Sequence, residues 1–307
     1  MPLYLTEKDV DGLIESVEAV DAVEECFQRL ARGAIENMPR RRLGLEGGAL
    51  AVMAAADSEL GLAGSKTYLA TAEGTTFVVS LFAAGETVAV IEADRLGQLR
   101  TGAASGVAAR HLAKPGAASL GVIGCGRQAE TQVACIRAAV PSIERVVAYC
   151  RTPQRLASFC KRTGAEQAEN HNEAAGQDVV VTATTSPDPV LRGDWLQLGT
   201  LVCAMGANRL SARELDDAVL QRAAFVCCDS KEQSRMESGD LVEPVAHGVL
   251  DWLEVHELQE VVSGELEGRQ SPEDVVVFKS NGLAAWDVAI GALAVEKARE
   301  RGVGRQV

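Results

Sequence analysis

The chain has 307 residues, enough for two domains, and its 47% hydrophobic and 24% charged residues are ordinary for a globular protein. With 30 basic and 43 acidic residues, the formal net charge is −13, which argues against nucleic acid and against an anionic membrane surface as partners. No apolar run is long enough to span a membrane. An anionic ligand would therefore have to be bound by a few local arginine or lysine side chains.

The eight cysteines and four histidines form no metal-ligand motif. No C-x-x-C pair occurs, and several cysteines lie in apolar, strand-like runs such as FVCCD. We therefore predict no metal site, and we expect free, buried thiols of a reducing cytoplasm. The N-terminal residues, MPLYLTEKDVDG, lack the basic and apolar regions of a signal peptide, which also favours a cytoplasmic location.

The N-terminal third of the chain reads as helix, then sheet, then helix. Apolar residues recur with a helical period over residues 6–34, and Gly12 with Ser16 predicts a break into two helices. Short β-type runs separated by glycine pairs and polar turns fill residues 43–92, which predicts an antiparallel or mixed sheet. An alanine-rich helix is expected over residues 94–113.

From about residue 117, strand and helix patterns alternate. The strand runs are ASLGVIG, RVVAYC, DVVVTAT, TLVCAMG and AFVCCD, and the intervening helices start near Gly126, Pro153, Ser211 and Ser234. Repeated βα units with continuously apolar strands predict a parallel, doubly wound sheet. Lys114-Pro115-Gly116 marks a domain boundary, and a last amphipathic helix runs from Asn281 or Gly282 to about Arg301.

The stretch LGVIGCGRQAETQ joins an apolar strand to a helix through a glycine turn. Gly124, Gly126 and Ala129 form G-x-G-x-x-A. In this pattern the first glycine permits the tight turn, the second lets the backbone approach a pyrophosphate, and the small third residue lets helix and strand pack closely. The helix start adds free N–H groups and a favourable dipole for phosphates. This context favours a dinucleotide site over a mere strand-to-helix turn.

The end of the next strand bears on the choice between NAD(H) and NADP(H). Sites for NAD usually place Asp or Glu there for the ribose hydroxyls, whereas this chain reads AYCRT, with no acid. Arg151 and Thr152 could bind a 2′-phosphate, and Arg127 adds charge in the turn. NADP(H) is therefore favoured and NAD(H) is the alternative, since Arg151 could also be a solvated strand-end arginine.

Three basic positions in the N-terminal half could meet an anionic substrate. The run Arg40–Arg42 follows Pro39, Lys66 lies between apolar strand-like runs, and Arg100 with Thr101 precedes a small-residue helix start. An arginine beside free helical N–H groups suits a carboxylate or a phosphate. The alternatives are a solvated arginine face and an edge-strand lysine that protects against aggregation.

Taken together, these motifs resemble the ornithine cyclodeaminase/mu-crystallin family nearly end to end. The matching segments are Pro39–Arg41, Gly64–Lys66, RTGAASG, VIGCGRQAETQ, Met205–Leu215 and FKSNGLAAWDVAIGALAVEKARERGVG. The resemblance implies an α/β protein that forms a homodimer. A Rossmann domain with a doubly wound parallel sheet, residues 115–283, would be inserted into a second α+β domain for substrate binding and dimerisation, residues 1–114 plus 284–307.

The resemblance also implies roles for individual residues. Arg41 and Arg100 would bind the substrate carboxylate, with Arg42 as the alternative to Arg41, and Lys66 would lie near the reacting carbon. The predicted cofactor-binding residues are Gly124, Gly126, Arg127, Gln128, Ala129, Arg151, Thr152, Thr184, Met205, Ser280 and Gly282. The predicted substrate-side residues are Arg42, Thr101 and Asn208. Trp286 and Asp287 of the last helix could serve in packing, in capping or in the site, and the sequence does not decide among these three roles.

Two positions depart from the family's cyclodeaminases. Those enzymes carry an Asp where this chain has Asn208, and an acidic residue near the position of Met53; a neutral amide cannot act as the base for the substrate's amino groups. The resemblance thus implies an NAD(P)H-dependent reductase of imines next to a carboxylate, with a small imino, keto or amino acid as substrate, such as pyrroline- or piperideine-2-carboxylate. Lys66, its pKa lowered by nearby arginines, would donate the proton. The alternatives are an ornithine cyclodeaminase, an alanine-dehydrogenase-like amino acid dehydrogenase, and an NADPH-dependent small-ligand binding protein.

Overall fold

The protein, in a computed structural model that describes residues 1–307, divides into two compact units. Unit 1 comprises Met1–Arg100 and Gly282–Val307, and unit 2 comprises Thr101–Asn281. Unit 1 is therefore built from both ends of the chain. The predicted first boundary, after residue 114, lies at the end of a helix, whereas the observed division lies inside that helix, which continues without a break. No helix of the structure is long and apolar enough to cross a membrane.

Unit 1 contains a seven-stranded mixed sheet in the order β15-β1-β6-β5-β4-β3-β2. Its strands are β1 (Leu3–Leu5), β2 (Ile35–Leu45), β3 (Gly48–Asp57), β4 (Leu62–Thr71), β5 (Thr75–Ala83), β6 (Glu86–Glu92) and β15 (Arg305–Gln306). The strands β2 to β6 pair antiparallel in sequence order, and β1 joins β6 in parallel. The predicted sheet is confirmed as mixed. It begins earlier than expected, because β2 starts at Ile35 and not at residue 43.

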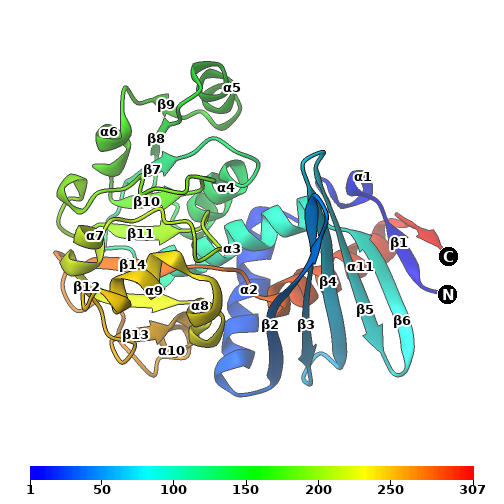
Figure 1. The fold of residues 1–307 in the computed structure, drawn as a ribbon. Coiled ribbons are helices and arrows are strands. Elements are labelled where there is room, and N and C mark those ends of the chain that lie inside the picture. Colours follow the sequence, from blue (N-terminus) through cyan, green and yellow to red (C-terminus); the bar gives the residue numbers. More distant parts are fainter. The chain divides into compact units, whose positions relative to one another are not determined.

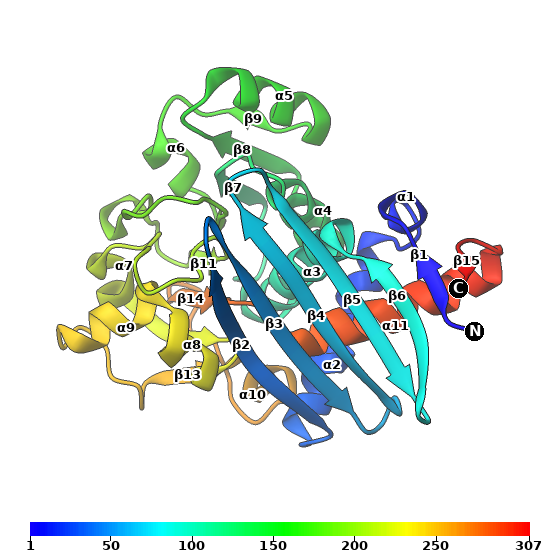
Figure 2. The same cartoon turned by 45° about the vertical axis from the view of Figure 1, so that its right-hand side comes forward.

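One face of this sheet is covered by helices. The helices of unit 1 are α1 (Glu7–Val10), α2 (Ser16–Ala31) and α11 (Ala284–Arg301), with the first part of α3 (Asp94–Leu112). Figure 2 shows α2 and α11 behind the broad sheet of β2 to β6. The ring of Phe27 in α2 meets that of Trp286 in α11 edge to face, with centroids 5.4 Å apart. The predicted break between two N-terminal helices is confirmed, since Gly12 takes the left-handed conformation there.

Unit 2 is an eight-stranded, wholly parallel sheet in the order β13-β12-β14-β11-β10-β7-β8-β9 (Figure 1). Its strands are β7 (Ser119–Ile123), β8 (Arg145–Tyr149), β9 (Glu166–Gln167), β10 (Val179–Thr182), β11 (Leu201–Ala204), β12 (Ala223–Cys228), β13 (Val255–Glu257) and β14 (Val275–Lys279). The chain proceeds from β7 toward β9 in one direction, then returns to β10 and β11 on the other side of β7. The predicted doubly wound sheet is confirmed, and its switch point lies between β7 and β10.

The helices of unit 2 connect these strands. They are α4 (Ala129–Ala139), α5 (Pro153–Thr163), α6 (His171–Ala175), the 3-10 helix η1 (Gly193–Trp195), α7 (Asp217–Arg222), α8 (Lys231–Glu237), α9 (Gly239–Ala246) and α10 (Leu258–Val262). The expected helix start near Ser211 was wrong, whereas Ser234 lies inside α8, which begins at Lys231. The side chains of Asp216 and Ser230 accept hydrogen bonds from backbone N–H groups and start α7 and α8 instead. The strand β14 was not among the strands expected from the sequence. All eight cysteines are free, and six of them are buried.

Candidate active site

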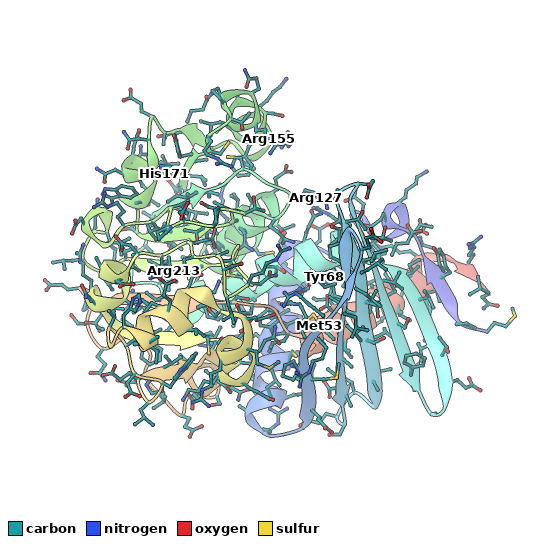
Figure 3. The ribbon with its side chains drawn as sticks, viewed as in Figure 1. Met53, Tyr68, Arg127, Arg155, His171 and Arg213 are labelled. Carbon is teal, nitrogen blue, oxygen red and sulfur yellow. The ribbon has the colours of Figure 1, made fainter.

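A buried lysine is the centre of the polar cluster in unit 1. Lys66 lies in β4 opposite Met53 of β3 and Val79 of β5, and only 3% of its side chain is exposed. Its Nζ donates a hydrogen bond to Oδ1 of Asp287 in α11 over 2.9 Å. Because side chains alternate along a strand, Tyr68 lies on the same face as Lys66 (Figure 3 labels Met53 and Tyr68). The cluster therefore faces the covered side of the sheet.

The same carboxylate also holds Arg100. Nε of Arg100 lies 3.3 Å from Oδ1 of Asp287, and its guanidinium lies 5.7 Å from the ring centroid of Trp286. Gly282 makes this position available, because a Cβ there would lie 2.4 Å from Nη1 of Arg100. Gly97 does the same for Lys66, whose Nζ would lie 2.8 Å from a Cβ at that position. Asp287, which the sequence did not rank, is thus a residue of the site.

The structure corrects the placement of the other arginine. Along β2, Pro39 and Arg40 together lie opposite the single residue Met53, which makes a β-bulge at a proline that cannot donate to the ladder. Arg40 is therefore buried on the face of Lys66, with 5% of it exposed. Arg41 pairs with Val52, so it lies on the opposite face and is exposed, which contradicts its predicted place beside Lys66. Arg42 is also exposed.

The electrostatics of the cluster favour a lysine that titrates near neutral pH. Burial lowers the pKa of Lys66 from 10.5 to about 8, and the positive charges of Arg100 and Arg40 act in the same direction. The carboxylate of Asp287 opposes this effect and keeps the pKa from falling further. The predicted direction agrees with the structure, but burial contributes more than the arginines.

The glycine turn of unit 2 borders a cavity of about 260 Å³. Gly124 has φ +107°, and a Cβ there would lie 2.5 Å from the carbonyl oxygen of Ala183. A Cβ at Gly126 would meet no atom closer than 3.9 Å, so the turn leaves room for a phosphate in front of the start of α4. These residues fit the dinucleotide that the motif predicts.

The cavity gathers part of the predicted cofactor set and adds to it. It is lined by residues that include Gly124, Gly126, Arg151, Thr152 and Thr184 from that set. Arg127, Gln128 and Ala129 continue the turn into α4, while Met205 and Ser280 directly follow β11 and β14. Gly282 belongs to unit 1, and Thr101 and Asn208 to unit 2.

Several residues that line the cavity were not predicted from the sequence, among them three with large polar or ionisable side chains. Tyr149 ends β8, Arg155 lies in the first turn of α5, and His171 begins α6 (Figure 3 labels Arg155 and His171). The rings of Tyr149 and His171 lie with centroids 4.4 Å apart, and burial lowers the pKa of His171. Arg155 lies about one helical turn after Thr152. This spacing could have predicted that both residues face the same cavity.

Comparison with known proteins decides the family. The profile of the ornithine cyclodeaminase/mu-crystallin family matches residues 2–302. The chain belongs to this family.

Members of the family resemble the chain over most of its length. Alanine dehydrogenase of Archaeoglobus fulgidus is 35% identical over 320 residues, which cover 99% of this chain and 98% of that protein. A Delta(1)-pyrroline-2-carboxylate reductase of Bacillus cereus is 38% identical over 238 residues, 75% of this chain and 73% of that protein. The solved Delta(1)-pyrroline-2-carboxylate reductase of Thermococcus litoralis, in complex with NADH and L-proline, superposes with a TM-score of 0.94 at 31% identity and covers 99% of this chain and 100% of that one.

Replacing Asp287 by Asn should lower the free energy of unfolding by about 3–5 kcal/mol, because Lys66 and Arg100 then lose their buried counter-ion. Urea unfolding followed by circular dichroism measures this. The matched control is Glu166→Gln, which breaks an exposed ion pair with Arg145 and should change the free energy of unfolding far less, because solvent screens that pair. Equal losses in the two variants would contradict the assignment of Asp287 as the counter-ion of the cluster.

Proposed function

We propose that the protein is an NAD(P)H-dependent reductase of a C=N bond next to a carboxylate. The substrate would be a cyclic imino acid such as pyrroline-2-carboxylate or piperideine-2-carboxylate, or the imine of a keto acid and an amine. The observation that carries this proposal is the buried Lys66, with a pKa of about 8, grouped with two arginines and one carboxylate. Such a group can bind a carboxylate and deliver a proton near neutral pH.

Each residue of the cluster has a chemical task in this proposal. The guanidinium groups of Arg40 and Arg100 bind the substrate carboxylate, since their planar donors match its two oxygens. The ammonium group of Lys66 donates its proton to the imine nitrogen, directly or through a water. Asp287 orients the ammonium group by accepting its hydrogen bond. A bound nicotinamide would supply the hydride.

Arg40 takes the task that the sequence assigned to Arg41. Arg40 shares the face and the electrostatic environment of Lys66, and Arg41 does not. Binding the carboxylate through two arginines would also set the orientation of the adjacent C=N bond, which lowers the entropic part of the barrier.

A second candidate is an amino acid dehydrogenase. It is favoured by the alanine dehydrogenase relative, which is similar over 99% of this chain. The same cluster would then serve an imine formed from a keto acid and ammonia. The cyclodeaminase alternative is disfavoured by Asn208 and Met53, because neither side chain can carry the negative charge that a second amino group requires.

The direct test is consumption of the reduced cofactor by the purified protein with three substrates. We expect oxidation of NADPH or NADH with pyrroline-2-carboxylate and slow or no turnover of pyruvate with ammonia. Faster turnover of pyruvate with ammonia would favour the dehydrogenase. Ammonia released from ornithine without net oxidation would contradict both reductive proposals.

Replacing Lys66 by Met should lower kcat by roughly 10²–10⁴-fold, the range of general acid catalysis, and leave cofactor affinity within about twofold. In the unmodified protein, kcat should fall as the pH rises above about 8, because the ammonium group that donates the proton is then lost. The variant should lack this pH dependence. The control Lys297→Met removes a lysine that pairs with Glu18 elsewhere on unit 1 and should keep kcat unchanged. An unchanged kcat in Lys66→Met would remove Lys66 from the mechanism.

We infer that NADP(H) is preferred over NAD(H). The support is the absence of an acidic residue at the end of β8 and the presence of Arg151, Thr152 and Arg155 around the cavity. Three such donors suit a 2′-phosphate. The Thermococcus relative was solved in complex with NADH. The preference of this chain therefore has to be measured directly.

Replacing Arg151 by Ala should weaken NADPH binding by about tenfold and NADH binding by less than about twofold, since only NADPH carries the 2′-phosphate. Titration of cofactor fluorescence gives both dissociation constants. Arg145→Ala, at the start of β8, the strand that Arg151 follows, is the control and should change neither value. Parallel losses for NADPH and NADH would contradict the preference.

A second copy of the chain is the partner we propose for the uncovered face of the unit 1 sheet. Opposite the helices, β3, β4 and β5 present no charged side chain, and Leu69 and Phe82 are 37% and 43% exposed there. Such a face suits a self-complementary contact. The molar mass in solution tests this proposal.

A further inference from the structure

A buried carboxylate ties together the ends of two central strands in unit 2. Glu214 has no exposed surface. Its Oε1 accepts hydrogen bonds from the backbone N–H and the hydroxyl of Thr184, over 2.7 and 2.8 Å. Its Oε2 accepts from Thr182 Oγ1, Gly206 N and Ala207 N, over 2.9, 2.6 and 3.2 Å. The residues that follow β10 and β11 are therefore held by one side chain.

These contacts favour the ionised form of Glu214, because three of the five donors are backbone N–H groups that can only donate, and each carboxylate oxygen accepts from at least one of them. All five partners donate, and a carboxylate accepts from every one of them, whereas a protonated carboxyl would bring a donor of its own. Burial raises the pKa of Glu214, and the nearby charge of Asp240 acts in the same direction, whereas the charge of Lys279 and the hydrogen bonds from Thr184 counteract both effects. The geometry thus places a negative charge beneath the ends of β10 and β11.

The neighbouring ion pair does not cancel this charge. Nζ of Lys279 lies 3.0 Å from Oδ2 of Asp240, whose Oδ1 accepts from the backbone N–H groups of Glu214 and Leu215. Two carboxylates therefore share one ammonium group. Arg213, labelled in Figure 3, pairs instead with the carboxylates of Asp217 in α7 and Glu243 in α9.

A third buried carboxylate has the same sign. Asp229, directly after β12, accepts hydrogen bonds from Ser280 Oγ and Asn281 N through its Oδ2. It lies at the end of β14, the strand next to β11. Buried carboxylates thus lie at the carboxyl ends of β10, β11 and β14.

The position of this charge matters because of where a dinucleotide binds in such a sheet. In such a sheet the turn between β7 and α4 would hold the pyrophosphate, and the cavity residues at the end of β8 would hold the adenosine side. The nicotinamide half then extends over the other side of the switch point, toward the ends of β10 and β11. The reduced nicotinamide ring is neutral and the oxidised ring carries a positive charge.

We propose that Glu214 makes the nicotinamide half of the site electronegative, so that the protein binds the oxidised cofactor more tightly, relative to the reduced one, than it would without this carboxylate. This inference rests on the proposed function and assigns an electrostatic positioning residue to it. Stabilising the cation that forms on hydride loss favours hydride donation to the imine carbon. The charge is fixed before the reaction and needs no reorganisation.

The test is the ratio of dissociation constants for the oxidised and reduced cofactor, measured by calorimetry and by cofactor fluorescence. Glu214→Gln should weaken binding of the oxidised form about tenfold more than binding of the reduced form, because only the oxidised ring carries a positive charge that the carboxylate attracts. Glu214→Asp keeps the negative charge but shortens the side chain by one methylene group, so that fewer of the five hydrogen bonds can form. It should weaken both forms in parallel and leave the ratio unchanged.

Controls separate this effect from a loss of folding. Glu257→Gln removes another half-buried carboxylate of unit 2, at the edge strand β13, and should leave the ratio unchanged. If Glu214→Gln does not fold, Asp240→Asn removes charge from the same network and should move the ratio in the same direction. An equal loss for both cofactor forms in the variant that folds would overturn the inference and leave the proposed function intact. If the unmodified protein bound neither form, the proposed function would fail as well.

Discussion

The buried carboxylate of Asp287 is the constraint on which unit 1 depends. It lies against Lys66 and Arg100, both of which are almost wholly removed from solvent. Two buried cations without a counter-ion would be strongly destabilising, so the lysine and the arginine can occupy these positions only when α11 supplies its aspartate. Lys66 and Asp287 are 221 residues apart in the sequence. The cluster therefore exists only because the end of the chain returns to the sheet that its beginning forms.

The two units carry opposite local charge within one acidic chain. The net charge of −13 led us to expect a few concentrated cations at any site for an anion, and unit 1 gathers Arg40, Lys66 and Arg100 around one carboxylate. In unit 2, buried carboxylates underlie the ends of β10, β11 and β14. The proposed chemistry uses both signs, since an anionic substrate needs cations and a cofactor that becomes positive benefits from anions.

Local signals made the nucleotide-binding fold predictable and left part of the substrate cluster unpredictable. The glycine turn and the apolar strands report a parallel sheet directly, because each strand of such a sheet is buried on both faces. The family resemblance pointed to Arg41, because it matches residues by their spacing from Pro39 and not by the face of the strand on which they lie. One β-bulge at Pro39 shifts the alternation by a residue and moves Arg40 to the face of Lys66. Pro39 inside a strand is the sequence feature that could have indicated this bulge.

The sequence by itself determined the elements whose causes are local: the glycine turn before α4, the alternating strands and helices of unit 2, and the last helix. Only the tertiary structure decided which groups surround the titratable side chains. Asp287 became the counter-ion of Lys66, burial rather than the arginines became the main cause of the low pKa, and Glu214 became the link between two strand ends. The physical reason is that desolvation and ion pairing depend on what long-range packing brings around a side chain, and no local pattern contains that information.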